Sequence, residues 1–500
     1  MANPIMIQGT MSSAGKSFIA AALCRIFCQD GYKAAPFKSQ NMALNSFITT
    51  DGFEIGRAQA MQAEAAGIEP TKYMNPILLK PTTDTGSQVI VNGRPVGNMS
   101  AAEYFKYKSE LIPDILKAYE ELSKIYDVII IEGAGSPAEI NLKKDDIVNM
   151  GLAEMLDSPV LLAGDIDRGG VFAQLYGTVM LLDNNERQRV KGIIINKFRG
   201  DRAILEPGLK MLEEKCGVPV KGVIPFVNID IDDEDSLSDR LQNTEKNGII
   251  DIAVIRLPKI SNFTDLNSLA RIEGVSVRYV NRLNELKEPD LIIIPGSKST
   301  IKDTLWLRQN GLESKIKRLA ANGVPVIGIC GGYQILGKKI ADPYFAEGGG
   351  EIDGIGLLDI YTVFESEKNQ SQESGILGDI SGFFGFISGA DVKGYEIHMG
   401  NSRIYENGES KALIMNTGSK IKAIGAYNKN VLGTYIHGFF DSSDICRAVS
   451  AKLFELKGLK GSSDIVSWDE YKNAQYDLLA ETVRKNIDMD YIYKIMGLRI

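Results

Sequence analysis

Short runs of aliphatic residues alternate with longer amphipathic segments along most of this chain, and this alternation limits the folds open to it. A first series of runs lies at residues 5–7, 128–131, 160–162 and 193–195, and a second at residues 252–255, 291–294 and 324–329. Continuous apolar runs of this length are typical of parallel strands buried on both faces. The sequence therefore predicts an α/β fold with doubly wound parallel sheets.

A polar segment between the two series predicts a domain boundary. The chain has 500 residues, which is more than one hydrophobic core usually supports. Residues 239–249 contain few apolar side chains, so we expect them to link a first domain at residues 1–238 to a second at residues 250–448. The pattern after this second domain is helical and predicts an extension over residues 449–500.

The composition argues against several classes of partner. The formal net charge is -8, and no cluster of Lys and Arg compensates for it, so a nucleic-acid partner is not expected. No apolar run approaches the length of a membrane span, and the first residues lack the charged segment of a signal peptide. The five cysteines are scattered, with no paired metal spacing. We therefore expect a reduced, cytoplasmic protein.

The first predicted strand runs directly into a glycine-rich loop and then into a helical segment. The loop contains Gly9, Thr10, Gly15, Lys16 and Ser17 and is one residue longer than the usual P-loop spacing. In this context backbone N–H groups and the helix N-terminus face phosphate oxygens. The lysine would reach the β- and γ-phosphates and the serine hydroxyl would hold Mg²⁺. The sequence predicts binding of ATP with Mg²⁺.

Two polar residues end later strands of the first series. Glu132 closes the run at residues 128–131 and is a candidate second Mg²⁺ ligand, because ligands bind at the carboxyl ends of parallel strands. The alternative is an acid beside a helix N-terminus. Asn196 follows the run at residues 193–195, and its amide can read a purine edge or simply cap a loop.

Cys330 follows the run at residues 324–329, and a glycine precedes and follows it at the positions of a nucleophile elbow. The chain has only two histidines, and one of them, His437, lies on another apolar run. A thiol and an imidazole are the groups of nucleophilic catalysis. The N–H of Gly331 and a second donor near Gly296 are candidates for the oxyanion hole. The alternative is that Cys330 is a small buried hydrophobic residue.

Residues 328–334, together with His437, resemble the class I glutamine amidotransferase domain. The resemblance implies that Cys330 and His437 release ammonia from glutamine, and that Gln334 helps form the glutamine pocket. Most members carry a glutamate two residues after the histidine, whereas this chain has Phe439 there. One branch of the family shares this departure, so we expect Cys330 and His437 to act as a pair without an orienting acid.

The N-terminal half resembles the dethiobiotin synthetase-like ATPases in its P-loop spacing. Further stretches are similar to the cobyric acid synthase family, at residues 36–42, 54–60, 74–81, 165–172 and 394–400. The resemblance implies a ligase of cobalamin biosynthesis that uses ATP and glutamine. Its reaction would amidate four side-chain carboxylates of adenosylcobyrinic acid a,c-diamide to give adenosylcobyric acid, through an acyl phosphate and ammonia. The expected partners are therefore small molecules: a corrinoid carboxylic acid, glutamine and ATP.

Four further residues receive candidate roles from these stretches. Lys38, Arg57 and Arg168 are candidates for binding substrate carboxylates or phosphate, and Glu54 is a further candidate Mg²⁺ ligand. For Lys38 and Arg57 the alternative is an ordinary solvated surface position. His398, the second histidine, either contacts substrate or packs within a strand.

Three other functions compete with this interpretation. The first is cobyrinic acid a,c-diamide synthase, which uses the same chemistry at other carboxylates. The second is a partitioning ATPase, which would carry a lysine early in the P-loop where this chain has Met11. The third is a non-catalytic glutamine sensor, and the presence of both Cys330 and His437 argues against it.

Overall fold

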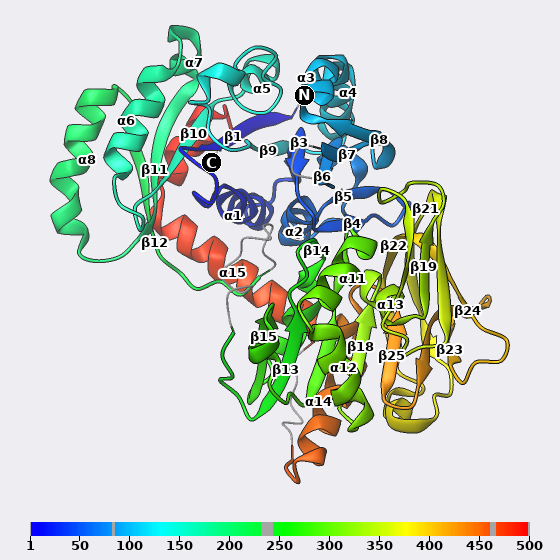
Figure 1. The fold of residues 1–500 in the computed structure, drawn as a ribbon. Helices are drawn as coiled ribbons and strands as arrows, with labels where there is room; N and C mark the ends of the chain where they lie inside the picture. Colours follow the sequence, from blue (N-terminus) through cyan, green and yellow to red (C-terminus); the bar gives the residue numbers. More distant parts are fainter. Residues whose placement is uncertain (1, 83–85, 232–243, 461–466, 499–500) are drawn as a thin grey trace. The chain divides into compact units, whose positions relative to one another are not determined.

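The computed structural model describes residues 2–82, 86–231, 244–460 and 467–498 (Figure 1). The chain forms two compact units. Unit 1 comprises Met1–Met42, Phe53–Asp232 and Tyr471–Ile500, and unit 2 comprises Ala43–Gly52 and Asp233–Glu470. Of the expected linker at residues 239–249, residues 239–243 lie outside the described residues.

Unit 1 is built on a sheet of six parallel strands (Figure 1). In spatial order these are β12 (Val220–Pro225), β11 (Val190–Phe198), β10 (Val160–Asp165), β1 (Asn3–Gly9), β9 (Val128–Glu132) and β2 (Ala34–Phe37). Each apolar run of the first series lies in one of these strands, so the predicted parallel sheet is confirmed. The carboxyl ends of β1 and β9 carry the P-loop and Glu132.

Both faces of this sheet are covered by helices, as the lack of apolar–polar alternation along its strands predicts. Met6 belongs to one hydrophobic cluster, whereas its neighbours Ile5 and Ile7 belong to another, because successive side chains of a strand point to opposite faces. The helices of this part are α1 (Lys16–Gln29), α2 (Arg57–Ala65), α3 (Ala101–Tyr107), α4 (Ile112–Ser123), α5 (Met150–Met155), α6 (Val171–Leu181), α7 (Asn184–Arg189) and α8 (Arg202–Cys216).

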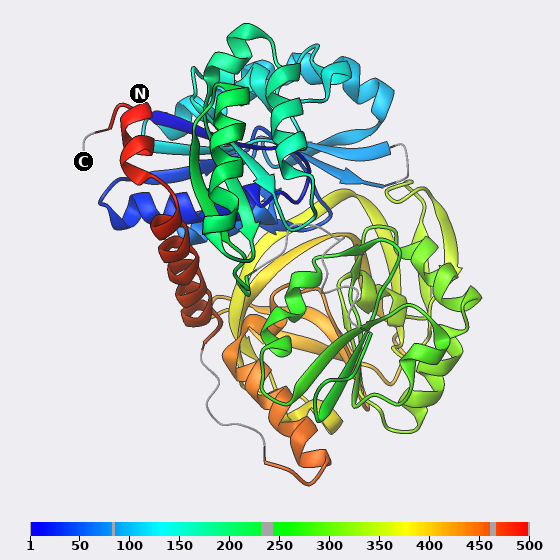
Figure 2. The same cartoon turned by 90° about the vertical axis from the view of Figure 1, so that its left-hand side faces the viewer.

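Two smaller features complete unit 1. A second sheet has the order β3 (Gln40–Met42), β6 (Ile77–Pro81), β7 (Gly86–Val91) and β8 (Arg94–Ser100), and a short strand β5 (Glu54–Gly56) leads into α2. The C-terminal helices α15 (Trp468–Asn486) and α16 (Met489–Ile495) lie against α1 (Figure 2). An ion pair of 2.8 Å between Arg25 and Asp477 joins α1 to α15.

Unit 2 contains a mixed sheet of eleven strands. Its parallel part has the order β15 (Val275–Val280), β13 (Ile250–Ile255), β16 (Leu291–Ile294), β18 (Val326–Ile329) and β25 (Val431–Thr434). The sheet continues through β24 (Ile421–Asn428), β23 (Lys411–Asn416), β21 (Ile360–Leu377), β19 (Lys339–Asp342) and β20 (Gly350–Asp353), and β22 (Asp391–Ile404) pairs with β21. The second series of apolar runs forms the centre of the parallel part, as predicted.

The remaining elements of unit 2 are short. Its helices are α9 (Asn267–Ala270), α10 (Leu283–Leu286), α11 (Thr300–Gln309), α12 (Leu312–Ala321), α13 (Gly331–Leu336) and α14 (Ser443–Leu456). Three further elements are the strands β14 (Ile260–Ser261) and β17 (Gly296–Ser297) and the 3₁₀ helix η5 (Phe263–Leu266). The strand β4 (Ser46–Ile48) lies in Ala43–Gly52, the early segment that belongs to unit 2. None of the helices in the described part of the chain is long and apolar enough to cross a membrane.

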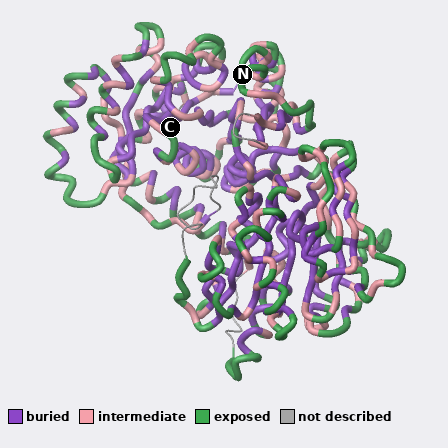
Figure 3. Tube along the Cα trace, viewed as in Figure 1, coloured by how far each residue is buried: buried purple, intermediate pink, exposed green. Residues whose placement is uncertain are grey.

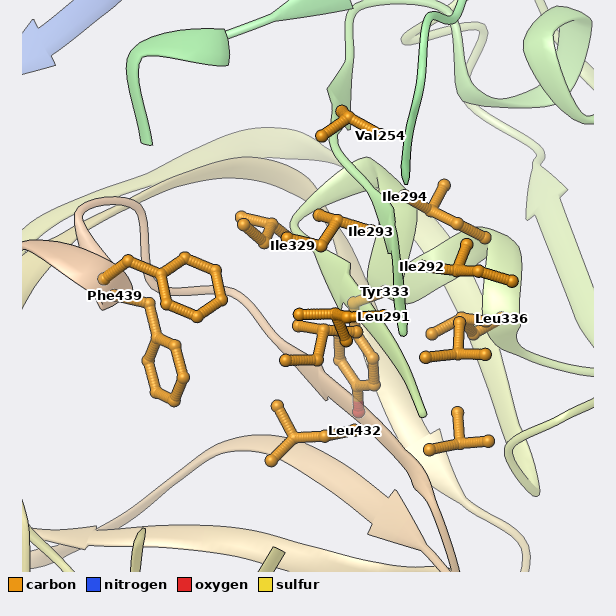
Figure 4. Close-up of a cluster of buried hydrophobic side chains, with 14 of the residues drawn as sticks. Val254, Leu291, Ile292, Ile293, Ile294, Ile329, Tyr333, Leu336, Leu432 and Phe439 are labelled. Carbon is orange, nitrogen blue, oxygen red and sulfur yellow. The ribbon is translucent and has the colours of Figure 1, made fainter. Parts of the chain in front are cut away.

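The buried stretches of both units follow the central strands (Figure 3). In unit 2 the core gathers the aliphatic side chains of β13, β16, β18 and β25 (Figure 4). Tyr333 and Phe439 lie in the same cluster. The strands that carry the candidate nucleophile and histidine therefore belong to the most buried part of this unit.

Candidate functional site

Cys330 occupies the sharp turn between β18 and α13. Its backbone has φ 50° and ψ -107°, a conformation that an L-residue adopts only when the surrounding structure enforces it. A Cβ on Gly332 would lie 1.9 Å from the Ile294 carbonyl oxygen, and one on Gly328 would lie 2.6 Å from the Gly332 carbonyl oxygen. The glycines are required because backbones approach closely here. Cys330 therefore has the geometry of a nucleophile elbow.

His437 follows β25, the strand that pairs in parallel with β18. Its Nδ1 lies 2.6 Å from an Asp265 carboxylate oxygen, and the Cys330 sulfur is near enough to affect the charge of the imidazole. Burial opposes a charge on the imidazole, but the Asp265 carboxylate and the Cys330 sulfur outweigh it and raise the pKa of His437 to about 10. A thiol beside such an imidazole can give up its proton to form an ion pair.

Asp265 lies in η5 and departs from the pair expected from the sequence. Its second carboxylate oxygen accepts the Gly438 N–H at 2.9 Å, so one carboxylate holds both the ring and the following backbone. No sequence signal marks this residue, because it lies 172 positions before His437. The position where most relatives carry glutamate is closed to an acid: Phe439 is fully buried and points into the hydrophobic core (Figure 4).

The two candidate oxyanion glycines flank the nucleophile. A Cβ on Gly331 would lie 2.8 Å from the Ser297 backbone nitrogen, so the elbow and β17 nearly touch. A Cβ on Gly296 would lie 3.3 Å from Cε1 of His437. The structure thus brings Gly296 and Gly331 together beside Cys330 and His437, where backbone N–H groups are available for a developing oxyanion.

Gln334 is held at both ends of its amide. Its Nε2 donates to the Tyr435 hydroxyl at 3.2 Å, and its Oε1 accepts from the Thr300 hydroxyl at 3.4 Å. Thr300 also donates its backbone N–H to Glu347 at 2.5 Å. Burial raises the pKa of Glu347 to about 7, against the opposing effects of Lys298 and of the Thr300 hydrogen bonds. Glu347 is a second residue beside Gln334 that sequence reasoning missed.

Two aromatic residues near the nucleophile have packing roles. Tyr333 lies with its ring edge against Tyr435, at 5.0 Å between centroids, and belongs to the core cluster (Figure 4). The His398 ring stacks on the Tyr435 ring, with 3.7 Å between centroids and 14° between planes. Its Nδ1 lies 2.7 Å from the Gly400 carbonyl oxygen. His398 is therefore a packed strand residue that supports Tyr435.

In unit 1 the P-loop has the expected strand–loop–helix form. Gly15 has φ 92° and immediately precedes α1. A Cβ at this position would lie 2.0 Å from Nδ2 of Asn196, which donates to the Ala14 carbonyl oxygen at 2.9 Å. The amide nitrogen of Asn196 therefore supports the loop backbone, and its expected contact with a purine stays a prediction. Thr10 donates to Oε1 of Gln174 at 3.1 Å.

Lys16 lies across the mouth of the P-loop and is mostly buried. Its ammonium group donates to the Met11 carbonyl oxygen at 2.9 Å and to the Gly135 carbonyl oxygen at 3.1 Å. These acceptors belong to the loops that follow β1 and β9. A cation held between these loops is placed where the phosphates of a nucleotide bind in a P-loop.

Glu132 is the centre of a buried polar cluster at the end of β9. Its Oε1 accepts from the Ser17 hydroxyl and from the Lys38 ammonium group, each at 2.9 Å, and its Oε2 accepts from Gln62 at 2.5 Å. The sequence brought Ser17, Lys38 and Glu132 into the candidate list separately, and the structure places them together. Gln62 was missed.

This cluster fits Mg²⁺ by its chemistry. A hydroxyl and a carboxylate are hard oxygen donors, and proteins usually hold Mg²⁺ through one or two carboxylates together with substrate phosphates. Among residues 2–82, 86–231, 244–460 and 467–498 there is no cluster of three His, Cys, Asp or Glu side chains that could hold a metal ion alone. Ser17 and Glu132 therefore suit an ion shared with a nucleotide.

The other candidate residues of unit 1 lie apart from this cluster in their contacts. Glu54 is fully buried and pairs with Lys80 at 2.9 Å. Arg57 pairs with Glu64 at 3.2 Å. Arg168 is 62% exposed in its side chain, and its nearest acid, Asp165, lies 4.0 Å away. Of the three proposed substrate-binding cations, Lys38 is hydrogen-bonded to Glu132 at 2.9 Å, whereas Arg57 and Arg168 pair with other acids.

Comparison with known proteins identifies the family of each region. A family model described as the CobB/CobQ-like glutamine amidotransferase domain matches residues 251–445. Another, described as the CobQ/CobB/MinD/ParA nucleotide binding domain, matches residues 5–237. The expected fold class, with an amidotransferase-like domain after a nucleotide-binding domain, is thereby confirmed.

Several curated relatives are similar over the full chain. Cobyric acid synthase of Ruminiclostridium cellulolyticum is 58% identical over 99% of this chain and 97% of its own length. The enzymes of that name from Lachnoclostridium phytofermentans and Alkaliphilus metalliredigens are 56% and 53% identical, over 99% and 98% of this chain and 99% of each relative. This chain, with its amidotransferase and nucleotide-binding regions, is a glutamine-using ligase and belongs to the cobyric acid synthase family.

Proposed function

We propose that this enzyme amidates four side-chain carboxylates of adenosylcobyrinic acid a,c-diamide, with ATP and glutamine as co-substrates, to give adenosylcobyric acid. The observation that carries the proposal is the pairing of a complete Cys330–His437–Asp265 triad with a P-loop in one chain. The full-length similarity to relatives named cobyric acid synthase supports the choice of substrate.

The triad performs the glutamine half-reaction. His437 takes the thiol proton, and the Cys330 sulfur attacks the side-chain amide of glutamine. The N–H groups at Gly331 and Gly296 stabilise the resulting oxyanion. His437 then protonates the departing nitrogen, so the C–N bond breaks and ammonia leaves a glutamyl thioester, which water hydrolyses to glutamate. Asp265 holds the imidazole in the orientation that both proton transfers need.

The P-loop and the Glu132 cluster perform the ligase half-reaction. A carboxylate is a poor acyl donor, so the γ-phosphoryl group of ATP is transferred to it and ammonia then displaces phosphate. Such a transfer depends on positioning and on neutralising charge. Lys16 binds the β- and γ-phosphates, and Ser17 and Glu132 would hold Mg²⁺, which neutralises phosphate charge when bound. We assign Lys38 to the acceptor carboxylate, and its hydrogen bond to Glu132 beside Ser17 supports this choice.

Cationic side chains are the candidates for binding the carboxylates of the corrinoid. Lys38 and Arg168 are the cations we assign to substrate carboxylates or phosphate. Arg57 is assigned only indirectly, because its guanidinium pairs with Glu64. Glu54 is a reserve metal ligand, since its carboxylate pairs with Lys80.

Mass spectrometry of the corrinoid product tests this function directly. The full-length enzyme is incubated with ATP, Mg²⁺, glutamine and either cobyrinic acid or its a,c-diamide in adenosylated form. We expect the a,c-diamide to gain four amides, with glutamate and ADP formed alongside. Consumption of cobyrinic acid itself with a gain of two amides would instead identify a cobyrinic acid a,c-diamide synthase. The absence of any amide with both substrates would refute the proposed reaction.

A further inference from the structure

Residues 43–52 form an insert that belongs to unit 2, although the residues before and after it belong to unit 1. The chain leaves unit 1 after Met42 and returns to it at Phe53, and Ala43–Gly52 form part of unit 2. The nucleotide-binding family model nevertheless spans residues 5–237, so it includes this insert. A segment that belongs by sequence to the nucleotide-binding region therefore folds as part of the amidotransferase unit.

The insert packs against Tyr395 of β22. The carbonyl oxygen of Ser46 accepts the Tyr395 hydroxyl at 2.9 Å. The ring of Phe47 meets the Tyr395 ring in an edge-to-face contact, with 5.4 Å between centroids and 60° between planes. Ile48 is fully buried in a small hydrophobic cluster with Tyr395 and Ile397. One polar and two apolar contacts thus hold a single tyrosine.

Tyr395 in turn holds His437. The two rings stack at 5.3 Å and 24°. The two backbones exchange hydrogen bonds, from Tyr395 N to the His437 carbonyl oxygen at 3.1 Å and from His437 N to the Tyr395 carbonyl oxygen at 2.8 Å. The approach is so close that a Cβ on Gly394 would lie 2.1 Å from the His437 carbonyl oxygen. A shift of Tyr395 would therefore move His437 as well.

The insert also reaches the acid of the triad. The Ser46 N–H donates to Oδ1 of Asn262 at 3.0 Å. Asn262 has φ 50° and begins η5, the turn that carries Asp265. The insert therefore contacts both elements that hold the imidazole, the tyrosine that stacks on it and the turn that supplies its carboxylate.

We propose that residues 43–52 position His437 in the amidotransferase site, with Phe47 as the principal positioning residue. The inference rests on the proposed catalytic roles of Cys330, His437 and Asp265. Phe47 acts through Tyr395 and touches no reacting atom. Its contact matters because proton transfer needs His437 within hydrogen-bond reach of both the sulfur and the leaving nitrogen, and small displacements of a catalytic group are costly in rate.

Phe47→Ala in the full-length chain tests the proposal. We expect kcat for glutamine hydrolysis to fall by about ten- to a hundred-fold, with KM for glutamine nearly unchanged. The alkaline limb of the activity should move to lower pH, because a loosened His437 loses part of its contact with Asp265. Amidation supported by ammonium salts should keep the wild-type rate. Tyr395→Phe, which removes only the hydroxyl bound to Ser46, should give a smaller fall of about two- to ten-fold.

Phe383→Ala is the matched control. Phe383 is a half-buried phenylalanine of the same unit that makes an edge-to-face contact with Phe384 at 5.0 Å, and none of its aromatic partners belongs to the triad. We expect this variant to lose stability without a change in the pH profile. Equal kcat values and equal alkaline limbs for the two alanine variants would overturn the proposal. An equal loss with glutamine and with ammonium salts would also overturn it, because the insert would then serve the ligase site.

Alkylation separates a failure of this inference from a failure of the proposed function. The glutamine analogue 6-diazo-5-oxonorleucine should label Cys330 in the wild type, and glutamine should protect against it. If the wild type is not labelled, the proposed role of Cys330 fails. If the wild type is labelled and Phe47→Ala is labelled at the same rate and pH dependence, the positioning role alone fails.

Discussion

The two sites of this enzyme differ in the partners of their functional side chains. In the amidotransferase unit, His437 lies 2.6 Å from Asp265, and the Asp265 carboxylate and the Cys330 sulfur both favour its charged form. In the nucleotide-binding unit, the functional groups are paired with one another. Ser17 and Lys38 share one oxygen of Glu132. The imidazole of the first site is oriented by a carboxylate, whereas the carboxylate of the second site is surrounded by hydrogen-bond donors.

This difference predicts how each half of the reaction depends on substrate binding. A preorganised thiol–imidazole–carboxylate arrangement acts as soon as glutamine is placed, because it needs little reorganisation. The Glu132 carboxylate already accepts from a hydroxyl, an ammonium group and an amide, so a metal ion would compete with these donors for its oxygens. We expect variants of the Glu132 cluster to affect binding of ATP as well as turnover.

Cys330→Ala should give the largest effect and confine it to one site. Without the sulfur nucleophile we expect glutamine-supported amidation to fall on the order of 10⁵-fold. Amidation supported by ammonium salts should stay near the wild-type rate, since the P-loop is untouched. Parallel assays of corrinoid product with the two nitrogen sources give the comparison. Release of glutamate by the variant would show that another group is the nucleophile.

Lys16→Ala should affect the other site, with a loss on the order of 10⁴-fold, because phosphoryl transfer loses a cation placed on the transferred phosphate. The loss should be the same with glutamine and with ammonium salts. Labelling of Cys330 by 6-diazo-5-oxonorleucine serves as the control and should be unchanged. A variant that is inactive with glutamine but active with ammonium salts would contradict the assignment of Lys16 to the ligase site.

Asp265→Asn tests whether the third residue makes the difference between the two sites. We expect kcat for glutamine hydrolysis to fall on the order of 10³-fold, because the amide no longer favours the charged imidazole. In the wild type, burial lowers the pKa of His437, but the Asp265 carboxylate and the Cys330 sulfur raise it to about 10, with Asp265 as the larger of these two effects. Its loss should bring the alkaline limb of the activity down towards pH 6.5.

The pH dependence of stability gives the same residue a second readout. A histidine whose pKa is raised on folding stabilises the protein fully below its unfolded value of about 6.5, and this contribution disappears as the pH rises through 10. Thermal unfolding of the wild type and Asp265→Asn should therefore differ most below about pH 6.5, differ progressively less as the pH rises, and converge above pH 10. Equal activity of the two proteins across this range would show that Cys330 and His437 act as a pair.

The sequence was sufficient for the parts of the molecule that depend on local pattern. The strand–loop–helix context predicted the P-loop, and the glycines around Cys330 predicted a nucleophile elbow, where the structure gives Cys330 a φ of 50°. Apolar runs predicted the parallel strands because full burial on both faces leaves a continuous aliphatic signature. In each case the informative residues are neighbours in the chain, so a short window contains the whole signal.

The rest could not be predicted because it depends on residues that meet only after folding. Asp265 reaches His437 across 172 positions, and Gln62 reaches Glu132 across 70. Nothing in the spacing of either pair distinguishes Asp265 from other acids or Gln62 from other amides in the sequence. The sequence also did not predict that most of α15 belongs to unit 1 or that residues 43–52 belong to unit 2, because packing between distant segments decides both.

Glu64→Gln should produce the smallest effect and shows what an ion pair of the nucleotide-binding unit contributes outside its chemistry. Glu64 accepts from Lys472 at 2.9 Å and from Tyr476 at 3.0 Å, both on α15, and pairs with Arg57. Despite the cost of burial, the charges of Arg57 and Lys472 and these hydrogen bonds lower the pKa of Glu64 to about 2. We expect the variant to lose about 2 kcal/mol of unfolding free energy at pH 7.

The sign of this effect fixes its pH window. A carboxyl whose pKa is lowered on folding stabilises the protein above its unfolded value of about 4.5, and the contribution is lost as the pH falls towards 2. Denaturant unfolding curves of wild type and variant should therefore be separated at pH 7 and converge in acid. Glutamine hydrolysis should be unchanged at pH 7, because no residue of the triad contacts Glu64. A fall in ATP-dependent amidation beyond that expected from stability would instead mean that Glu64 holds Arg57 for the substrate, and the ion pair would then belong to the ligase site.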